Sequence, residues 1–144
     1  MDFMTAVKHV FSNYATFSGR ARRSEYWWWV LFNFAVSIVL GWIPIIGFII
    51  MLGLLIPSIA VAVRRMHDTG RSGWWILLPA VPGVLLGATT GASLANGAAP
   101  GILGIILGLA YLAAIILILV WFVQRGTVGP NQFGEDPYDA PPAG

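Results

Sequence analysis

The stretch "WWWVLFNFAVSIVLGWIPIIGFIIMLGLLIPSIAVAV" (Trp27–Val63) contains no charged residue. A second stretch without charge runs from Trp74 to Gln124. Uncharged segments of this length do not form soluble helices, because a soluble helix needs a polar face toward water. The whole chain is 58% hydrophobic and 10% charged, whereas soluble domains carry about 25% charged residues. These features predict an integral membrane protein.

Each of the two apolar stretches is long enough for two membrane spans, since a helix needs about 20 apolar residues to cross the hydrocarbon core. The segments "GWIPIIG" (41–47) and "NGAAPG" (96–101) contain the glycines and prolines that interrupt helices. We therefore predict an all-α fold, a single membrane domain over residues 1–144. Its four transmembrane helices are expected at about 26–42, 45–63, 74–95 and 102–123.

The basic residues predict the orientation of these helices. With four spans, all of them fall on one side of the membrane, and the other two hairpins contain none. The eight basic residues are Lys8, Arg20, Arg22, Arg23, Arg64, Arg65, Arg71 and Arg125. Because basic loops stay inside the cell, we expect the N-terminus (1–25) and the tail (124–144) in the cytoplasm. The seven tryptophans lie at the expected span ends, which is typical of interfacial anchors.

The two terminal segments have different characters. In the first, Phe3, Val7 and Val10 share one face at helical spacing, which predicts a short amphipathic helix in the membrane interface or against a partner. The tail is rich in glycine and proline and is expected to be extended. Alternatively, its first part, around Thr127 and Asn131, folds back on the arginine segments.

Small residues recur in the third and fourth spans. They are Gly83, Gly87, Gly91, Gly104 and Gly108. Small residues let membrane helices approach closely, so we expect these two spans to pack together, or the third to form an oligomer contact. The spans contain no carboxylate, lysine or histidine, which disfavours proton-coupled transport.

The densest polar segment is "RRMHDTGRSG" (64–73), which we interpret as a loop. In one interpretation, Asp68 or Thr69 forms a turn or cap and neutralises arginines. In the other, two arginine-rich loops bind an anionic lipid headgroup or a protein partner, because guanidinium groups recognise phosphate. The candidate binding residues are Arg20, Arg22, Arg23, Arg64, Arg65, His67, Asp68 and Arg71.

Catalysis and metal binding have little support in the sequence. Asp68-Thr69-Gly70 matches the aspartic protease triplet, but no apolar strand and no second aspartate accompany it. His67 and Asp68 lack further metal ligands, and the chain has no cysteine. We predict no catalytic residue, metal, cofactor or nucleic-acid partner. An enzyme that acts on phosphorylated lipid through these two residues is a weaker alternative.

The motifs "FSGRARRSEYWWWVLFN", "RRMHDTGRSGWW" and "GPNQFGEDPY" resemble the YhaH-like bacterial inner-membrane family, a domain of unknown function. The matching positions are Gly19, Arg20, Arg22, Arg23, Glu25, Trp28, Arg64, Arg65, His67, Asp68, Gly70, Arg71, Gly73, Trp74, Trp75, Asn131, Phe133 and Gly134. The resemblance implies four transmembrane helices and a bacterial inner membrane, without an activity. We expect a non-enzymatic membrane protein that forms a homo-oligomer and whose arginine-rich cytoplasmic face binds anionic lipid or a partner. A small oligomeric transporter or channel, with its pore between subunits, is the alternative.

Overall fold

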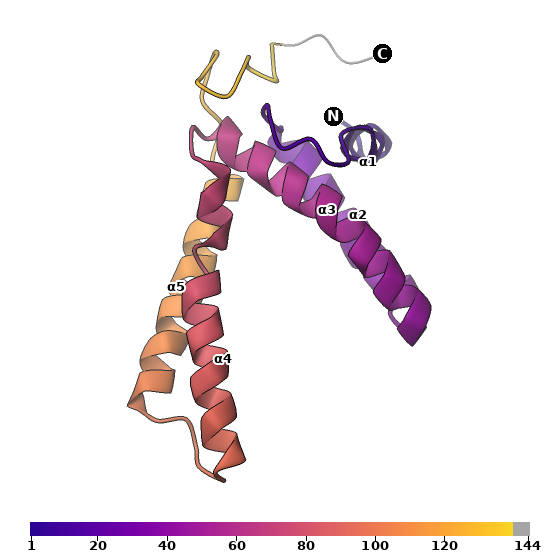
Figure 1. Ribbon diagram of the computed structural model, residues 1–144. Coiled ribbons are helices and arrows are strands. Elements are labelled where there is room, and N and C mark those ends of the chain that lie inside the picture. The colour runs from indigo at the N-terminus through magenta and orange to yellow at the C-terminus, as the bar shows by residue number, and fades with distance from the viewer. Residues whose placement is uncertain (140–144) are drawn as a thin grey trace. The chain divides into compact units, whose positions relative to one another are not determined.

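The computed structural model describes residues 1–139, which form five α-helices and one short 3-10 helix (Figure 1). The elements are α1 (Phe3–Ser12), α2 (Arg23–Leu40), α3 (Pro44–Asp68), η1 (Gly73–Leu77), α4 (Ala80–Ala95) and α5 (Ile102–Val123). The all-α prediction is confirmed, because the described residues contain no strand apart from one isolated bridge, between Asn131 and Gly134. The last residues of the predicted tail, 140–144, lie outside the described residues.

The chain divides into two compact units. The first comprises Met1–Gly73 together with the segment that begins at Gln124, and the second comprises Trp74–Val123. Every charged residue of the chain lies in the first unit. We call its charged part (residues 1–25, 64–72 and 124–139) the headpiece.

Three helical segments of the described chain are long and apolar enough to cross a membrane. They are Pro44–Asp68, Gly73–Ala95 and Ile102–Val123, which coincide with the second, third and fourth predicted spans. α3 differs from the prediction at its C-terminal end, because residues 64–68 continue the helix. The segment that we interpreted as a loop is therefore irregular only from Thr69, where the backbone N–H still bonds back to Met66.

α2 and α3 pack against each other around Trp29. This side chain is only 1% exposed, and its indole Nε1 donates to Ser58 Oγ at 3.0 Å. Trp29 is therefore a core residue and not the interfacial anchor that its place in the Trp27–Trp29 run suggested. Trp42, by contrast, is 86% exposed, as an anchor at the end of a span requires.

A proline within α3 creates an acceptor that α3 alone does not satisfy. Pro57 lies inside the helix and has no N–H, so the carbonyl of Gly53, four residues earlier, loses its usual partner. The hydroxyl of Tyr14 donates to this carbonyl. The segment after α1 is thereby attached to the middle of α3.

α1 packs mainly on α2. The ring of Phe3 meets Trp28 edge to face at 5.7 Å between centroids, and Phe11 meets Trp29 at 5.2 Å. Figure 1 shows α1 along its axis where α2 and α3 are seen lengthwise, so α1 crosses the α2–α3 pair. The buried residues of α1 are Ala6, Val7 and Val10.

In the second unit, α4 and α5 form a helical hairpin with little buried surface. A Cβ at Gly83 would lie 3.0 Å from the Tyr111 ring, and one at Gly108 would lie 4.0 Å from Leu86. These two glycines are thus places where the neighbouring helix comes close. A Cβ at Gly87 or Gly91 meets no atom within 4 Å, and one at Gly104 meets only Pro100.

Candidate functional site

Asp68 lies at the centre of the headpiece, between two arginines. Arg20 donates through Nε to Asp68 Oδ1 at 3.0 Å, and Arg65 donates through Nη1 to Asp68 Oδ2. The Arg65 and Asp68 side chains are fully buried, and that of Arg20 is nearly so. Each carboxylate oxygen therefore accepts from a different guanidinium, which is the arrangement that makes a buried charge tolerable.

The same two arginines bind the main chain of the tail. Arg20 donates through Nη2 to Thr127 O at 2.5 Å and through Nη1 to Gly129 O at 2.6 Å, and Arg65 donates to Gln124 O. The N–H of Thr127 returns a bond to Asp68 O at 2.8 Å. The tail therefore folds back on the arginine segments through backbone carbonyls, so Glu135 and Asp139 are not needed for this contact.

His67 provides a second contact with the tail. Its ring stacks on Phe133 with 4.0 Å between centroids and 2° between planes, and Asn131 Nδ2 donates to the His67 carbonyl at 2.9 Å. On its other side, His67 Nδ1 is 3.0 Å from Gly19 O. The histidine thus joins the residue before Arg20 to the tail.

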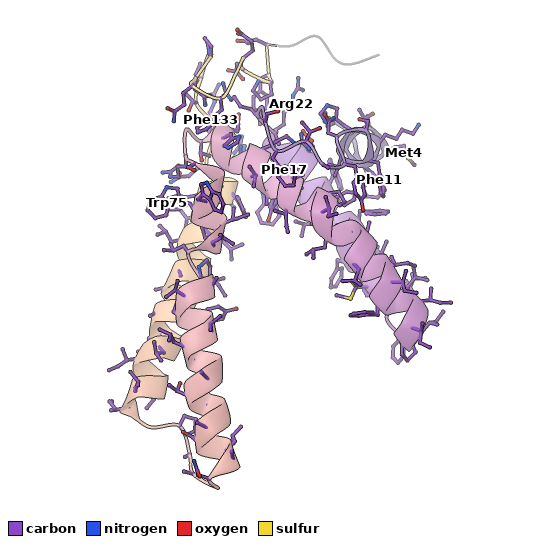
Figure 2. All side chains as sticks on the ribbon, viewed as in Figure 1. Met4, Phe11, Phe17, Arg22, Trp75 and Phe133 are labelled. Atoms are coloured by element: carbon purple, nitrogen blue, oxygen red, sulfur yellow. The ribbon has the colours of Figure 1, made fainter. Side chains whose placement is uncertain are left out.

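Arg22 binds the end of the described tail. Its Nε donates to Pro137 O at 2.6 Å, and its guanidinium lies 5.2 Å from the Tyr138 ring centroid. Figure 2 labels Arg22 and Phe133, two of the side chains that contact other headpiece segments. Nearby, Asp136 accepts from the N–H groups of Tyr138 and Gly129, and these bonds hold the pKa of its carboxyl below the usual value.

A separate buried ion pair joins α2 and α3. Arg64 Nη1 donates to Glu25 Oε1 at 2.7 Å, and His9 Nδ1 of α1 lies 3.0 Å from the same oxygen. Burial raises the pKa of the Glu25 carboxyl, but the bonds from His9 and Arg64 outweigh burial and leave it lowered. Arg64 Nε and Nη2 are also buried and have no hydrogen-bond partner within the described residues.

Gly126 is a site residue that sequence reasoning missed. A Cβ built on it would overlap the Asp68 carboxylate, so only glycine lets the tail pass this close to the arginine pairs. The sequence signal was weak, because Gly126 is one of several glycines in a segment that reads as turn or coil.

The predicted binding residues differ in how deeply they lie in the headpiece. Five of them lie in the interior of the headpiece or directly beside it: Arg20, Arg64, Arg65, His67 and Asp68. Arg22 and Arg23 contact the end of the described tail, and Arg71, half-buried, donates to Thr69 O at 3.3 Å. Over residues 1–139, no group of three or more histidine or acidic side chains is arranged to hold a metal ion.

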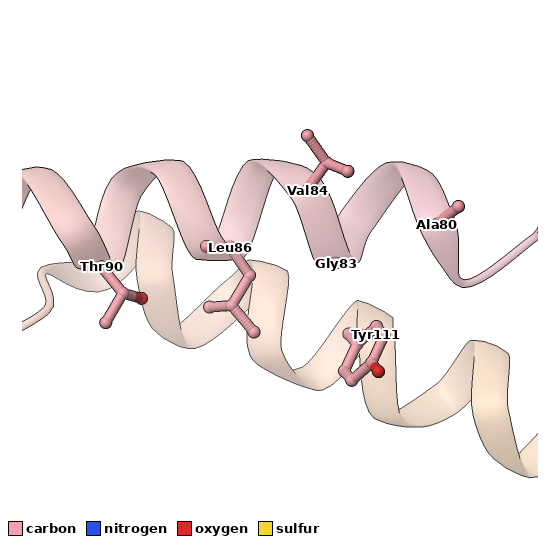
Figure 3. A pocket seen from close by; sticks show the side chains of 7 residues that line it. Ala80, Gly83, Val84, Leu86, Thr90 and Tyr111 are labelled. Atoms are coloured by element: carbon pink, nitrogen blue, oxygen red, sulfur yellow. The ribbon is translucent and has the colours of Figure 1, made fainter. Parts of the chain in front are cut away.

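The second unit contains a shallow groove between α4 and α5 (Figure 3). Its volume is about 610 Å³. In the figure, Leu86 and Thr90 of α4 point toward α5, and Tyr111 of α5 lies beside Gly83. The lining residues are Ala80, Gly83, Val84, Leu86, Gly87, Thr90 and Tyr111.

The family described as "Protein of unknown function (DUF805)" matches residues 14–135, a range that includes both arginine segments and most of the described tail. The chain belongs to the DUF805 family. It is similar to the inner membrane protein YhaI of Escherichia coli (strain K12), with 33% identity over 89% of this chain and 91% of YhaI. It is 32% identical to the inner membrane protein YhaH of the same organism, over 89% of this chain and 92% of YhaH.

YhaI and YhaH confirm the family resemblance. They also confirm the prediction of a membrane protein, because both relatives are inner membrane proteins. A third relative, the uncharacterized protein YiiR of Escherichia coli (strain K12), is 33% identical over 94% of this chain and 92% of its own length. No solved structure matches the chain.

Proposed function

We propose that this chain is a non-enzymatic inner-membrane protein with four transmembrane helices and cytoplasmic termini, whose headpiece binds anionic lipid at the membrane surface. α2 is the additional span in this proposal. Two polar side chains in its middle bond within the helix, Asn33 Nδ2 to Trp29 O at 2.9 Å and Ser37 Oγ to Asn33 O at 2.8 Å. Side chains that satisfy themselves in this way tolerate a lipid environment.

The distribution of charge supports the orientation. The hairpins between α2 and α3 and between α4 and α5 contain no charged residue, whereas the headpiece contains all fourteen, eight basic and six acidic. Basic residues near span ends remain in the cytoplasm. This asymmetry supports a headpiece on the cytoplasmic side.

The observation that carries the lipid proposal is the exposed edge of α1. One face of this helix is buried against α2, yet Met4 and Phe11 remain 56% and 43% exposed, and Lys8 follows them around the helix. Figure 2 labels both apolar side chains on α1. An apolar edge beside a lysine is typical of a helix that lies in the interface, with its apolar side chains among acyl chains.

The charges at the headpiece surface favour an anionic membrane. Three basic and three acidic side chains are buried, which leaves five basic residues against three acidic ones that are exposed or half-buried. The five are Lys8, Arg22, Arg23, Arg71 and Arg125. Each basic residue near an anionic surface contributes about 1 kcal/mol.

The non-enzymatic part of the proposal is supported by the state of the two candidate catalytic side chains. Both oxygens of Asp68 accept from arginines, and His67 is stacked on Phe133. Asp68 thus acts as a counter-ion for arginines and His67 takes part in a packing contact, roles that account for both side chains without the proton exchange that acid–base catalysis requires.

Lys8→Glu tests the lipid proposal. In nanodiscs, amide hydrogen exchange in α1 should be about fivefold slower with phosphatidylglycerol than with phosphatidylcholine alone, the factor that corresponds to about 1 kcal/mol. Lys8→Glu should abolish this difference, and Lys8→Arg should retain it. Equal exchange in the two lipids, or a difference that survives Lys8→Glu, contradicts the proposal.

The alternative, a transporter or channel with a pore between subunits, is favoured by the groove between α4 and α5. Its Thr90 and Tyr111 would supply hydroxyl groups in an otherwise apolar lining. A transporter or channel predicts ion or solute flux into sealed liposomes that contain the purified protein. Flux that Gly87→Leu abolishes would favour this alternative, whereas no flux above protein-free liposomes would count against it.

A further inference from the structure

We infer that the Nε and Nη2 edge of Arg64 binds a phosphate group. The inference rests on the proposed function and locates one anionic lipid at a defined position. The Arg64 side chain is 3% exposed, and its Nη1 is bonded to Glu25. The other two nitrogens are buried and have no acceptor among residues 1–139.

Arg20 shows what a satisfied guanidinium looks like in the same headpiece. Its Nε donates to Asp68, its Nη1 to Gly129 O and its Nη2 to Thr127 O. A buried donor without an acceptor is destabilising, and more so when it is charged. The buried Nε and Nη2 of Arg64 therefore destabilise the headpiece unless an acceptor binds them, and the described protein groups provide none.

The geometry of the free edge selects the acceptor. Nε and Nη2 of a guanidinium present two parallel N–H groups, which match two oxygens of one phosphate. Glu25 holds the opposite end of the guanidinium and so fixes its plane.

The Nη1 end of the Arg64 guanidinium lies close to the headpiece surface, whereas Nε and Nη2 are themselves buried, so a phosphate reaches them only when the segments that cover them move apart. Glu25 Oε1 contacts both Arg64 and His9, and the His9 side chain is 34% exposed. One carboxylate therefore separates the guanidinium from a side chain that reaches the surface, where α1 meets α2. A lipid headgroup and free phosphate share the chemistry that this edge recognises.

The test compares Arg64→Lys with Arg125→Lys, an exchange at an exposed arginine. Lysine keeps a cation for Glu25 but lacks the two-pronged edge. In native mass spectrometry of the full chain with phosphatidylglycerol, we expect one tightly held lipid per subunit, at least tenfold weaker in Arg64→Lys. Binding should be unchanged in Arg125→Lys, because lysine keeps the surface charge, which is all that Arg125 contributes toward an anionic membrane. If inorganic phosphate binds with the same dependence and displaces the lipid, free phosphate is the source. If Arg64→Lys binds both the lipid and inorganic phosphate as tightly as the wild type does, the inference is overturned.

A second measurement covers the case in which Arg64→Lys does not fold. In wild-type protein with ¹⁵N-labelled arginine, a slowly exchanging guanidinium should show ¹⁵N–³¹P dipolar coupling from Nε and one Nη. No such coupling overturns the inference. The Lys8 exchange experiment separates the two proposals: if α1 still responds to phosphatidylglycerol while Arg64 shows no phosphate contact, only the inference fails.

Discussion

Asp68→Asn is expected to destabilise the headpiece by about 3–5 kcal/mol, the usual cost of removing one partner of a buried ion pair. The carboxylate neutralises Arg20 and Arg65 from its two oxygens, and all three side chains are essentially buried. Asparagine has the same shape but no charge, and its amide turns two N–H donors toward a guanidinium. The variant therefore leaves two buried cations without a counter-charge between them.

The effect is measured as the free energy of unfolding in bicelles and as the rate of trypsin cleavage after Arg125. Cleavage should accelerate, because Arg65 also binds the carbonyl of Gln124 and Arg20 that of Thr127. Asp139→Asn is the matched control, since Asp139 is exposed and surface changes usually stay within about 0.5 kcal/mol. If both variants unfold and are cleaved like the wild type, Asp68 does not organise the headpiece.

The sequence predicts the helical spans well because a membrane imposes strong constraints. Uncharged stretches of span length leave few alternatives to helix, and glycine and proline mark the interruptions. α5 therefore has the predicted limits, Ile102–Val123, and η1 and α4 together cover most of the third predicted span. α3 runs beyond its predicted end because its last turn is stabilised by buried ion pairs, which hydrophobicity does not reveal.

The headpiece is harder to predict because much of it depends on backbone acceptors. Arg20 binds the carbonyls of Thr127 and Gly129, and a carbonyl carries no signature in a residue pattern. Trp29 illustrates a related limit, since three tryptophans in a row look alike in sequence. Only the packing of α2 on α3 assigns the third one to the core, where it bonds Ser58.

Gly126→Ala is expected to destabilise the headpiece by adding one methyl group. The new Cβ would overlap the Asp68 carboxylate, and a forced shift of this kind costs about 1–3 kcal/mol. The short Asp68 side chain cannot move aside without lengthening its bonds to Arg20 and Arg65. The cost therefore rises toward about 3–5 kcal/mol if those ion pairs separate.

Gly87→Ala is the matched control, and it should change stability in the opposite direction. Gly87 lies inside α4, and a Cβ there meets no atom within 4 Å, so alanine should stabilise the helix by about 0.5–1 kcal/mol. The two exchanges add the same atoms, which means that a loss at Gly126 alone identifies its contact with Asp68 as the cause. Similar stability changes in both variants would instead indicate that the tail does not pack on Asp68. Combining Gly126→Ala with Asp68→Asn distinguishes further: because both act on the same carboxylate, their effects should fall well short of additive.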